Sequence, residues 1–198
     1  MANLEQFTVK QLRLELHQVK DALKVLLHSI LFQRELGIVT PRQVESECGV
    51  SYLTLGDITT DKFIEERLAF FEARLRASTQ LTVALSFYEL QKRKGVIRLF
   101  NDSQKIVWEE WRIPVQLVAS LPEDRQRADA RLGKKLRKRL MQVIEHVCEK
   151  KDHLPAMGEP DSPEVIRYKF EVNVLDDPDS SGTSGLIGKF VPNFLSNP

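Results

Sequence analysis

Hydrophobic and polar residues follow two different periods along the first part of the chain. In the segment Phe7–His17, every second residue from Leu12 to Leu16 is a leucine. One face of this segment is therefore apolar, which predicts a β-strand. In Val19–Leu31 the apolar residues recur every three or four positions. This spacing predicts a well-buried helix that ends by Gly37.

The middle of the chain predicts a short strand, a second helix and a pair of strands. The strand is expected over Ser51–Leu55 and the helix over Thr60–Ala77, capped by Thr59 or by its own first residue. Strict alternation of apolar and polar residues returns in Leu81–Tyr88 and again in Trp111–Leu117. Two strands joined by one loop most simply pair antiparallel.

The second strand of this pair contains an unusual run of residues, "VWEEWRIPV". If the strand is regular, Trp111 faces the core, while Trp108 points the opposite way and lies towards the exposed or loop side. Glu109 and Glu110 are adjacent, so they diverge and do not form an acid–base pair. Pro114 has no N–H to donate, which indicates an edge strand or an outward-facing position.

The last third of the chain predicts a long helix over residues 123–151 and a strand over Ile166–Val174. Together the elements predict an α+β fold, with three helices on one face of a mainly antiparallel sheet. A glycine- and serine-rich composition after residue 175 predicts a core domain of residues 1–175 and a flexible C-terminal segment of residues 176–198. The inner face of the long helix is expected to contain Leu132, Leu136, Leu140, Val143, Ile144 and Val147.

Composition and charge narrow the class of protein. The chain has 198 residues, of which 42% are hydrophobic and 29% charged, and a net charge of +1. The length and composition fit one ordinary globular domain. The near-zero net charge does not indicate that the whole protein is attracted electrostatically to nucleic acid or anionic lipid. Cys48 and Cys148 have no paired spacing, which favours a reducing compartment. No secretory signal or membrane span is recognised, so a soluble cytosolic protein is expected.

No motif in the sequence predicts catalysis, a cofactor or a bound metal. The glycine patterns of phosphate-binding loops and the serine-nucleophile motif are absent. His146 and Cys148 would point about 200° apart on a helix, so they cannot share one metal ion there. With His153, they are expected to be solvent-facing or loosely packed. We therefore expect no enzyme and no cofactor.

Two features could bind a partner. The first is a basic run with six cationic residues between Arg131 and Arg139, interrupted by leucines at helical spacing. The cations therefore lie on the outer face of the helix, where they form a solvated or protein-binding surface. The alternative is a surface that binds nucleic acid or an anionic membrane, although no aromatic residues interleave with the cations to stack on bases. The second is the apolar tip of the loop between the paired strands, which either folds back on its own domain or docks a partner. The tip residues are Val96, Ile97, Leu99 and Phe100.

Several stretches resemble the HORMA-domain family, and within it the branch of small subunits of the autophagy-initiation kinase complex. They are "LRLELHQVKDALKVLLHSILFQR", "SYLTLGDITTDKFIEERLAFFEARLR", "VWEEWRIPVQLVA", "RADARLGKKLRKRLMQVIEHVCEKKDHLP" and "YKFEVNV", which together span nearly the whole chain. The resemblance implies a HORMA-like fold with a C-terminal belt segment. It also implies a cytoplasmic, non-catalytic adaptor that acts where autophagosomes form.

The resemblance further implies a partner and two surfaces. The partner is the HORMA domain of autophagy-related protein 13, which the adaptor stabilises as a heterodimer. Family members recruit downstream autophagy factors through a Trp-Pro-Phe loop tip, but this chain has Arg98 in place of the tryptophan, and only Phe100 matches. By resemblance to HORMA dimers, the heterodimer contact is expected on the third helix, at Arg131, Lys134, Arg137 and Lys138.

Overall fold

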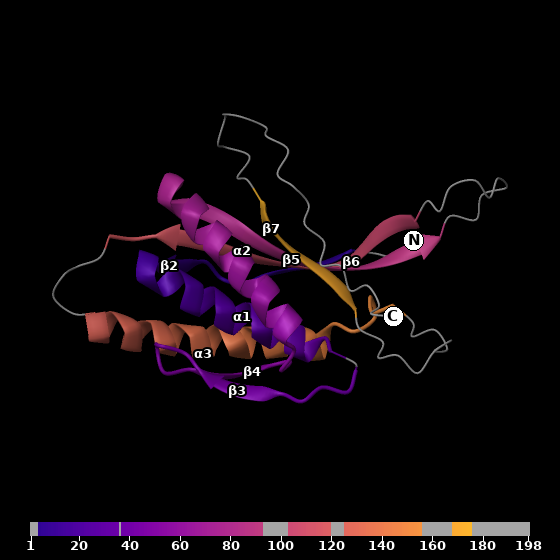
Figure 1. Ribbon diagram of the computed structural model, residues 1–198, viewed down its shortest axis with the longest axis horizontal. Helices are drawn as coiled ribbons and strands as arrows, with labels where there is room; N and C mark the ends of the chain where they lie inside the picture. The colour runs from indigo at the N-terminus through magenta and orange to yellow at the C-terminus, as the bar shows by residue number, and fades with distance from the viewer. Residues whose placement is uncertain (1–3, 36, 93–102, 120–124, 156–167, 176–198) are drawn as a thin grey trace.

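The computed structural model describes residues 4–35, 37–92, 103–119, 125–155 and 168–175. These residues form the predicted α+β fold, in which three α-helices pack with a mainly antiparallel sheet (Figure 1). The helices are α1 (Val19–Gln33), α2 (Ile58–Ala77) and α3 (Arg125–Glu149). The strands are β1 (Glu5–Thr8), β2 (Leu12–Leu14), β3 (Arg42–Glu45), β4 (Ser51–Thr54), β5 (Gln80–Lys92), β6 (Ser103–Leu117) and β7 (Lys169–Leu175).

The larger sheet has the strand order β1-β6-β5-β7, and β2 also pairs with β6. The pairs β5–β6 and β5–β7 are antiparallel, as the alternating segments predict, whereas β1 and β2 run parallel to β6. The expected single strand over Phe7–His17 is therefore two short strands. A short 3₁₀ turn, Leu16–Gln18, then leads into α1.

Strand β6 is an internal strand, so the prediction that Pro114 marks an edge is wrong. On the side facing β1 and β2, the β1 register ends at Arg112 and the β2 register begins at Val115. Pro114 lies opposite the break between these two short strands. Neither β1 nor β2 pairs with β6 at that position, so the missing N–H interrupts no ladder on that side, although β5 pairs with Pro114 through Thr82 on the other.

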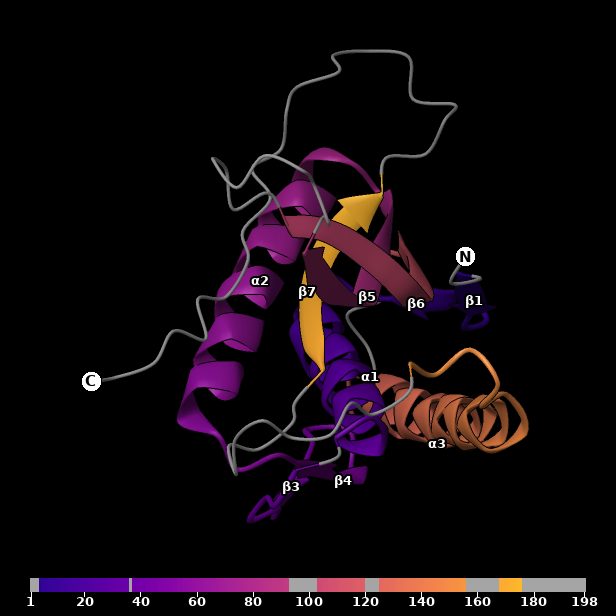
Figure 2. The same ribbon diagram turned by 90° about the vertical axis from the view of Figure 1, so that its right-hand side faces the viewer.

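Helix α1 is the central element of the fold. Nine of its 15 residues are buried, because it contacts α2, α3 and β4 and lies beneath the sheet. Figures 1 and 2 both place the β3–β4 hairpin at the end of the molecule away from the large sheet, with α1 between them. Strand β4 was predicted, but β3 was not. Three of the four β3 residues are exposed, so β3 lacks a strong alternating pattern.

Helix α2 begins two residues before the predicted start. Its N-cap is Asp57, whose carboxylate accepts hydrogen bonds from the backbone N–H groups of Thr59 and Thr60 at 3.2 and 3.3 Å. The predicted threonine cap is therefore wrong. Asp57 satisfies two of the amide groups that have no partner within the first turn of a helix.

The backbones of α3 and of the turn before β4 are in close contact at Gly133. A Cβ atom at Gly133 would overlap the carbonyl oxygen of Cys48. Any residue other than glycine would therefore force one of the two backbones to shift. Gly56 has a similar constraint. Its φ is +73°, and a Cβ atom there would overlap the carbonyl oxygen of Thr40.

A β-bulge in the β5–β6 hairpin changes the expected positions of the "WEEW" residues. Phe87 pairs with Glu109, but Tyr88 pairs with Val107, so Trp108 is the extra residue on β6. Trp108 is only 1% exposed and stacks on Phe87, with 5.5 Å between the ring centroids. The prediction of an exposed Trp108 is therefore wrong, because a bulge interrupts the regular alternation of faces. Trp111 is buried as predicted.

Candidate functional site

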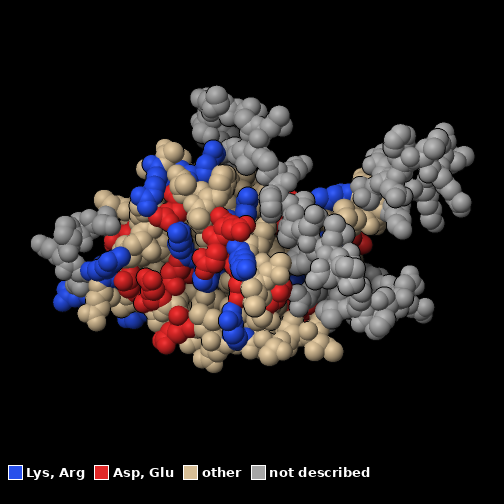
Figure 3. Space-filling model, viewed as in Figure 1, with Lys and Arg blue, Asp and Glu red and all other residues tan. Residues whose placement is uncertain are grey.

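The four cationic residues expected at a partner surface all lie on the exposed side of α3 (Arg131, Lys134, Arg137 and Lys138). Leu132 and Leu136 between them are buried, as the helical spacing predicts. The guanidinium of Arg137 also donates a hydrogen bond, from Nη2, to the carbonyl oxygen of Gly49, which holds the end of this side chain against the turn before β4. The space-filling view shows cationic and anionic side chains interspersed over the face that carries α2 (Figure 3).

The C-terminal half of α3 exposes apolar side chains that the sequence placed inside or did not single out. Ile144 was predicted to face the core, but it is 40% exposed, so that prediction is wrong. Met141, three residues earlier, is 56% exposed. Helical periodicity identifies an apolar position but not whether a neighbouring element covers it.

Ile144 lines a groove between α1, β4 and α3. The groove has a volume of about 130 Å³, and Leu53 of β4 is 37% exposed beside it. Met141 lies three residues after Lys138 and three residues before Ile144 on α3, so it connects the cationic stretch to the groove. We call this continuous surface the α3 surface. The apolar lining of the groove consists of Phe32, Tyr52, Leu53, Leu140, Val143 and Ile144.

The second predicted docking feature is the hairpin tip. Its residues Val96, Ile97, Leu99 and Phe100 lie outside the described residues. The structure describes β5 as far as Lys92 and β6 from Ser103 onwards.

A buried polar network connects β6, the end of α1 and the segment after α3. The Glu109 carboxylate is 0% exposed and accepts hydrogen bonds from the guanidinium of Arg34 (Nε to Oε1, 2.9 Å; Nη2 to Oε2, 2.7 Å). It also accepts one from Trp111 Nε1 at 2.5 Å, and His153 Nε2 lies 2.6 Å from Oε2. His153 was expected to be solvent-facing or loosely packed, and that prediction is wrong. No local spacing could reveal a partner 44 residues away.

Glu110 lies on the opposite face from Glu109, as predicted. Its carboxylate accepts hydrogen bonds from Arg112 Nε at 2.8 Å and from Gln6 Nε2 at 3.3 Å. The two glutamates therefore have separate partners on separate faces of the sheet. They do not converge on a common site.

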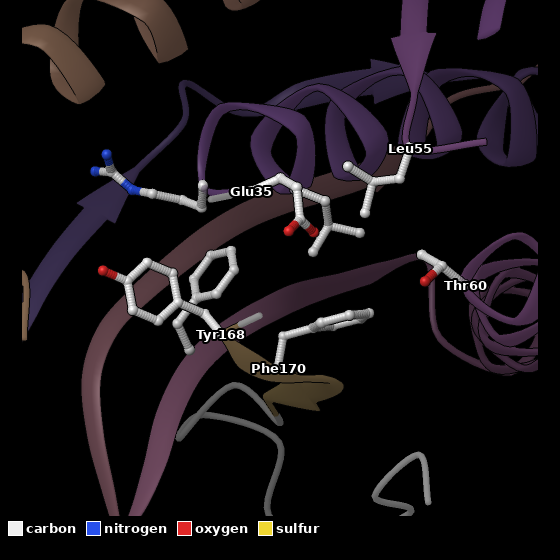
Figure 4. Close-up of a pocket in the computed structure, with 8 residues that line it drawn as sticks. Glu35, Leu55, Thr60, Tyr168 and Phe170 are labelled. Atoms are coloured by element: carbon white, nitrogen blue, oxygen red, sulfur yellow. The ribbon is translucent and has the colours of Figure 1, made fainter. Parts of the chain in front are cut away.

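A small cavity lies beside the Glu109 network (Figure 4). The carboxylate of Glu35 points towards it, and the rings of Tyr168 and Phe170 form its opposite wall. Its volume is about 20 Å³, enough for about one water molecule. Burial raises the pKa of the Tyr168 hydroxyl, so this group stays protonated at neutral pH. A cavity of this size cannot hold a cofactor.

In the described part of the chain, no group of three or more His, Cys, Asp and Glu residues is arranged to hold a metal ion. No helix among the described residues is both long and apolar enough to cross a membrane.

The three helices, the mainly antiparallel sheet and the long β5–β6 hairpin are consistent with a HORMA-like domain, the class that the sequence resemblance predicts. Residues 11–161 match the family model described as autophagy-related protein 101. The chain therefore belongs to the autophagy-related protein 101 family, and this membership indicates an autophagy-related role.

Curated relatives agree with this family. The chain is 28% identical to autophagy-related protein 101 of Arabidopsis thaliana over 90% of its own length and 91% of the relative. It is 27% identical to the protein of the same name in Xenopus tropicalis, over 85% of this chain and 82% of the relative. Against the Homo sapiens protein the identity is 26%, over 75% and 74% of the two chains.

Proposed function

We propose that this chain is a non-catalytic adaptor of the autophagy-initiation kinase complex. It forms a heterodimer with the HORMA domain of autophagy-related protein 13, stabilises that domain and supports autophagosome formation in the cytoplasm. The observation that supports this proposal is the α3 surface, where an apolar groove adjoins exposed cations.

The chemistry of the α3 surface favours a protein partner. Met141 and Ile144 are 56% and 40% exposed, and burying a large apolar side chain contributes about 1.5–3 kcal/mol. Stable interfaces combine a central apolar patch with a polar rim, and arginine is enriched in them. In this arrangement Arg137 and Lys138 lie at the rim and pair with carboxylates of the partner.

The experiment is co-expression with the HORMA domain of autophagy-related protein 13, followed by size-exclusion chromatography at micromolar concentration. The wild-type chain is expected to co-elute with that domain in one peak. Ile144→Asp is expected to separate the two proteins, because a carboxylate would be buried in an apolar contact. Ile58→Asp is the matched control, since Ile58 is 67% exposed on α2, away from the α3 surface. Two separate wild-type peaks would exclude the proposed heterodimer.

The alternative function is binding of nucleic acid or an anionic membrane surface through the cationic residues of α3. Its supporting observation is the exposed cationic stretch Arg131–Lys138 on one helix. Binding through phosphates would weaken steeply as salt increases. It would also be abolished by charge reversal at Lys134, Lys135 and Lys138. The absence of binding to nucleic acid or anionic vesicles at low salt would eliminate this alternative.

We also propose that the hairpin tip, Val96–Phe100, recruits downstream autophagy factors, and that residues 176–198 act as the belt segment of the core domain formed by residues 1–175. Deletion of residues 96–100 should leave the heterodimer intact and abolish recruitment. Substitutions on the α3 surface should instead abolish the heterodimer. Pull-down with both variants separates the two functions.

A further inference from the structure

A polar cavity lies between α1, α2 and the β3–β4 hairpin. Its volume is about 370 Å³. Lys24 and His28 of α1 form one wall, Arg42 and Thr54 of the hairpin form another, and Asp61 of α2 closes the third side. None of these residues borders the groove of the α3 surface.

Three buried polar atoms in this cavity have no hydrogen-bond partner. His28 is 0% exposed, and neither of its ring nitrogens is hydrogen-bonded. The Oδ1 atom of Asp61 is also buried without a donor, while Oδ2 of the same carboxylate is paired with Arg42. His28 Nδ1 and Asp61 Oδ1 are 4.0 Å apart, which is too far for a direct hydrogen bond. Buried polar groups are nearly always satisfied, so a donor between these two atoms is missing.

The missing donor is best supplied by an ammonium group. Burial lowers the pKa of His28 to about 4, so its ring is neutral at pH 7 and one nitrogen can accept a hydrogen bond. A single nitrogen can lie about 2.9 Å from two acceptors that are 4.0 Å apart. The positive charge would be compensated by Asp61, since Lys24 is already paired with Glu65.

The cavity adjoins a groove between Arg42, the first residue of β3, and the first half of α2. This groove has a volume of about 400 Å³, and Arg42 and Asp61 line both spaces. Two carboxylates of α2, Glu65 and Glu66, line it together with one cation, Lys62, and Ile58 exposes an apolar side chain there.

Strand β3 pairs only with β4 among the described residues, so its outer edge presents backbone N–H and C=O groups without strand partners. An open strand edge beside a groove is the geometry by which proteins add an extended peptide as a further strand. The backbone then provides affinity, and alternate side chains enter the groove.

We propose that the β3 edge and its groove bind an extended peptide, and that a lysine side chain of this peptide enters the cavity and donates hydrogen bonds to His28 and Asp61 Oδ1. Arg42 controls entry to the cavity, because its ion pair with Asp61 lies where the cavity and the groove meet, and its side chain is 62% exposed. An exposed ion pair contributes little, so the guanidinium can swing into solvent when the lysine enters. This site is independent of the proposed heterodimer.

The test uses random octapeptides displayed on phage and selected on the full chain. Enriched peptides are synthesised with blocked ends, and their affinity is measured by fluorescence anisotropy. They are expected to share one lysine position, and replacement of that lysine by norleucine should weaken binding about tenfold or more. N-methylation of alternate backbone amides on one edge of the peptide should also abolish binding, because it removes strand hydrogen bonds.

Variants of the chain complete the test. Asp61→Asn should weaken the lysine peptides about tenfold or more, whereas Glu72→Gln, which removes a carboxylate on α2 away from the groove, should not change their affinity. If Asp61→Asn lowers the melting temperature strongly, His28→Leu replaces it, since it removes the other acceptor. The proposal is overturned if no peptide is enriched, if enriched peptides lack a basic residue, or if both variants bind them as tightly as the wild type.

Discussion

Arg34 and Glu109, 75 positions apart in the sequence, form a bidentate ion pair inside the core. Arg34 is 5% exposed and Glu109 is 0% exposed. The remaining acceptor capacity of the carboxylate is used by Trp111 and His153. The pair therefore fixes the end of α1 to β6, and His153 attaches the segment after α3 to the same carboxylate.

Removing one partner of this pair should be strongly destabilising. Arg34→Met leaves the Glu109 carboxylate buried without its main counter-charge, which we expect to cost about 3–5 kcal/mol of unfolding free energy. Urea denaturation measures this change. The double variant Arg34→Met/Glu109→Leu should recover part of the loss, because no charge remains buried. Equal stability of Arg34→Met and the wild type would contradict a stabilising role of the pair.

His28 should make the unfolding free energy depend on pH. Burial lowers its pKa from 6.5 to about 4 in the folded chain, so between these values only the unfolded chain binds the proton. The stability is therefore complete above pH 6.5 and falls by about 3 kcal/mol as the pH drops to 4. Urea denaturation at several pH values measures this slope. His28→Leu should remove this part of the slope, and an unchanged slope would refute the assignment to His28.

Gly133→Ala should destabilise the chain although alanine is the better helix former. Helix propensity alone would stabilise the chain by about 1 kcal/mol. The new methyl group, however, would overlap the carbonyl oxygen of Cys48, and such overpacking costs about 1–3 kcal/mol. Thermal denaturation should therefore show a lower melting temperature. Ala130→Gly, at an exposed position of the same helix, is the control that measures the effect of helix propensity alone. A higher melting temperature for Gly133→Ala than for the wild type would disprove the close contact.

The cap of α2 gives a test that separates the structure from the sequence prediction. Asp57→Ala should lower the unfolding free energy by about 1 kcal/mol, because two backbone amides lose their acceptor. Thr59→Ala should change it by less than about 0.5 kcal/mol, since Thr59 is exposed and only its backbone is used. Chemical denaturation measures both changes, and a larger loss of unfolding free energy for Thr59→Ala than for Asp57→Ala would support the predicted threonine cap.

Much of the fold could be predicted from the sequence because burial of one face imposes a local period. The apolar spacing in α1 and α2 and the alternation in β5 and β6 place these elements correctly to within a few residues, apart from the ends of the β5–β6 hairpin. The exposed positions of Arg131 and Lys138 follow from the same helical period. Strand β3 was missed because most of its side chains face solvent and leave no pattern.

Tertiary structure alone decided the features that depend on distant residues. The sequence determined that α3 has an apolar face, but only the packing of α3 against its neighbours, chiefly α1, decided that Leu136 is covered and Ile144 is not. Similarly, the bulge that buries Trp108 is set by the pairing of β5 with β6. The physical reason is that periodicity records which side chains share a face, whereas burial and ion pairing depend on which elements meet that face in space.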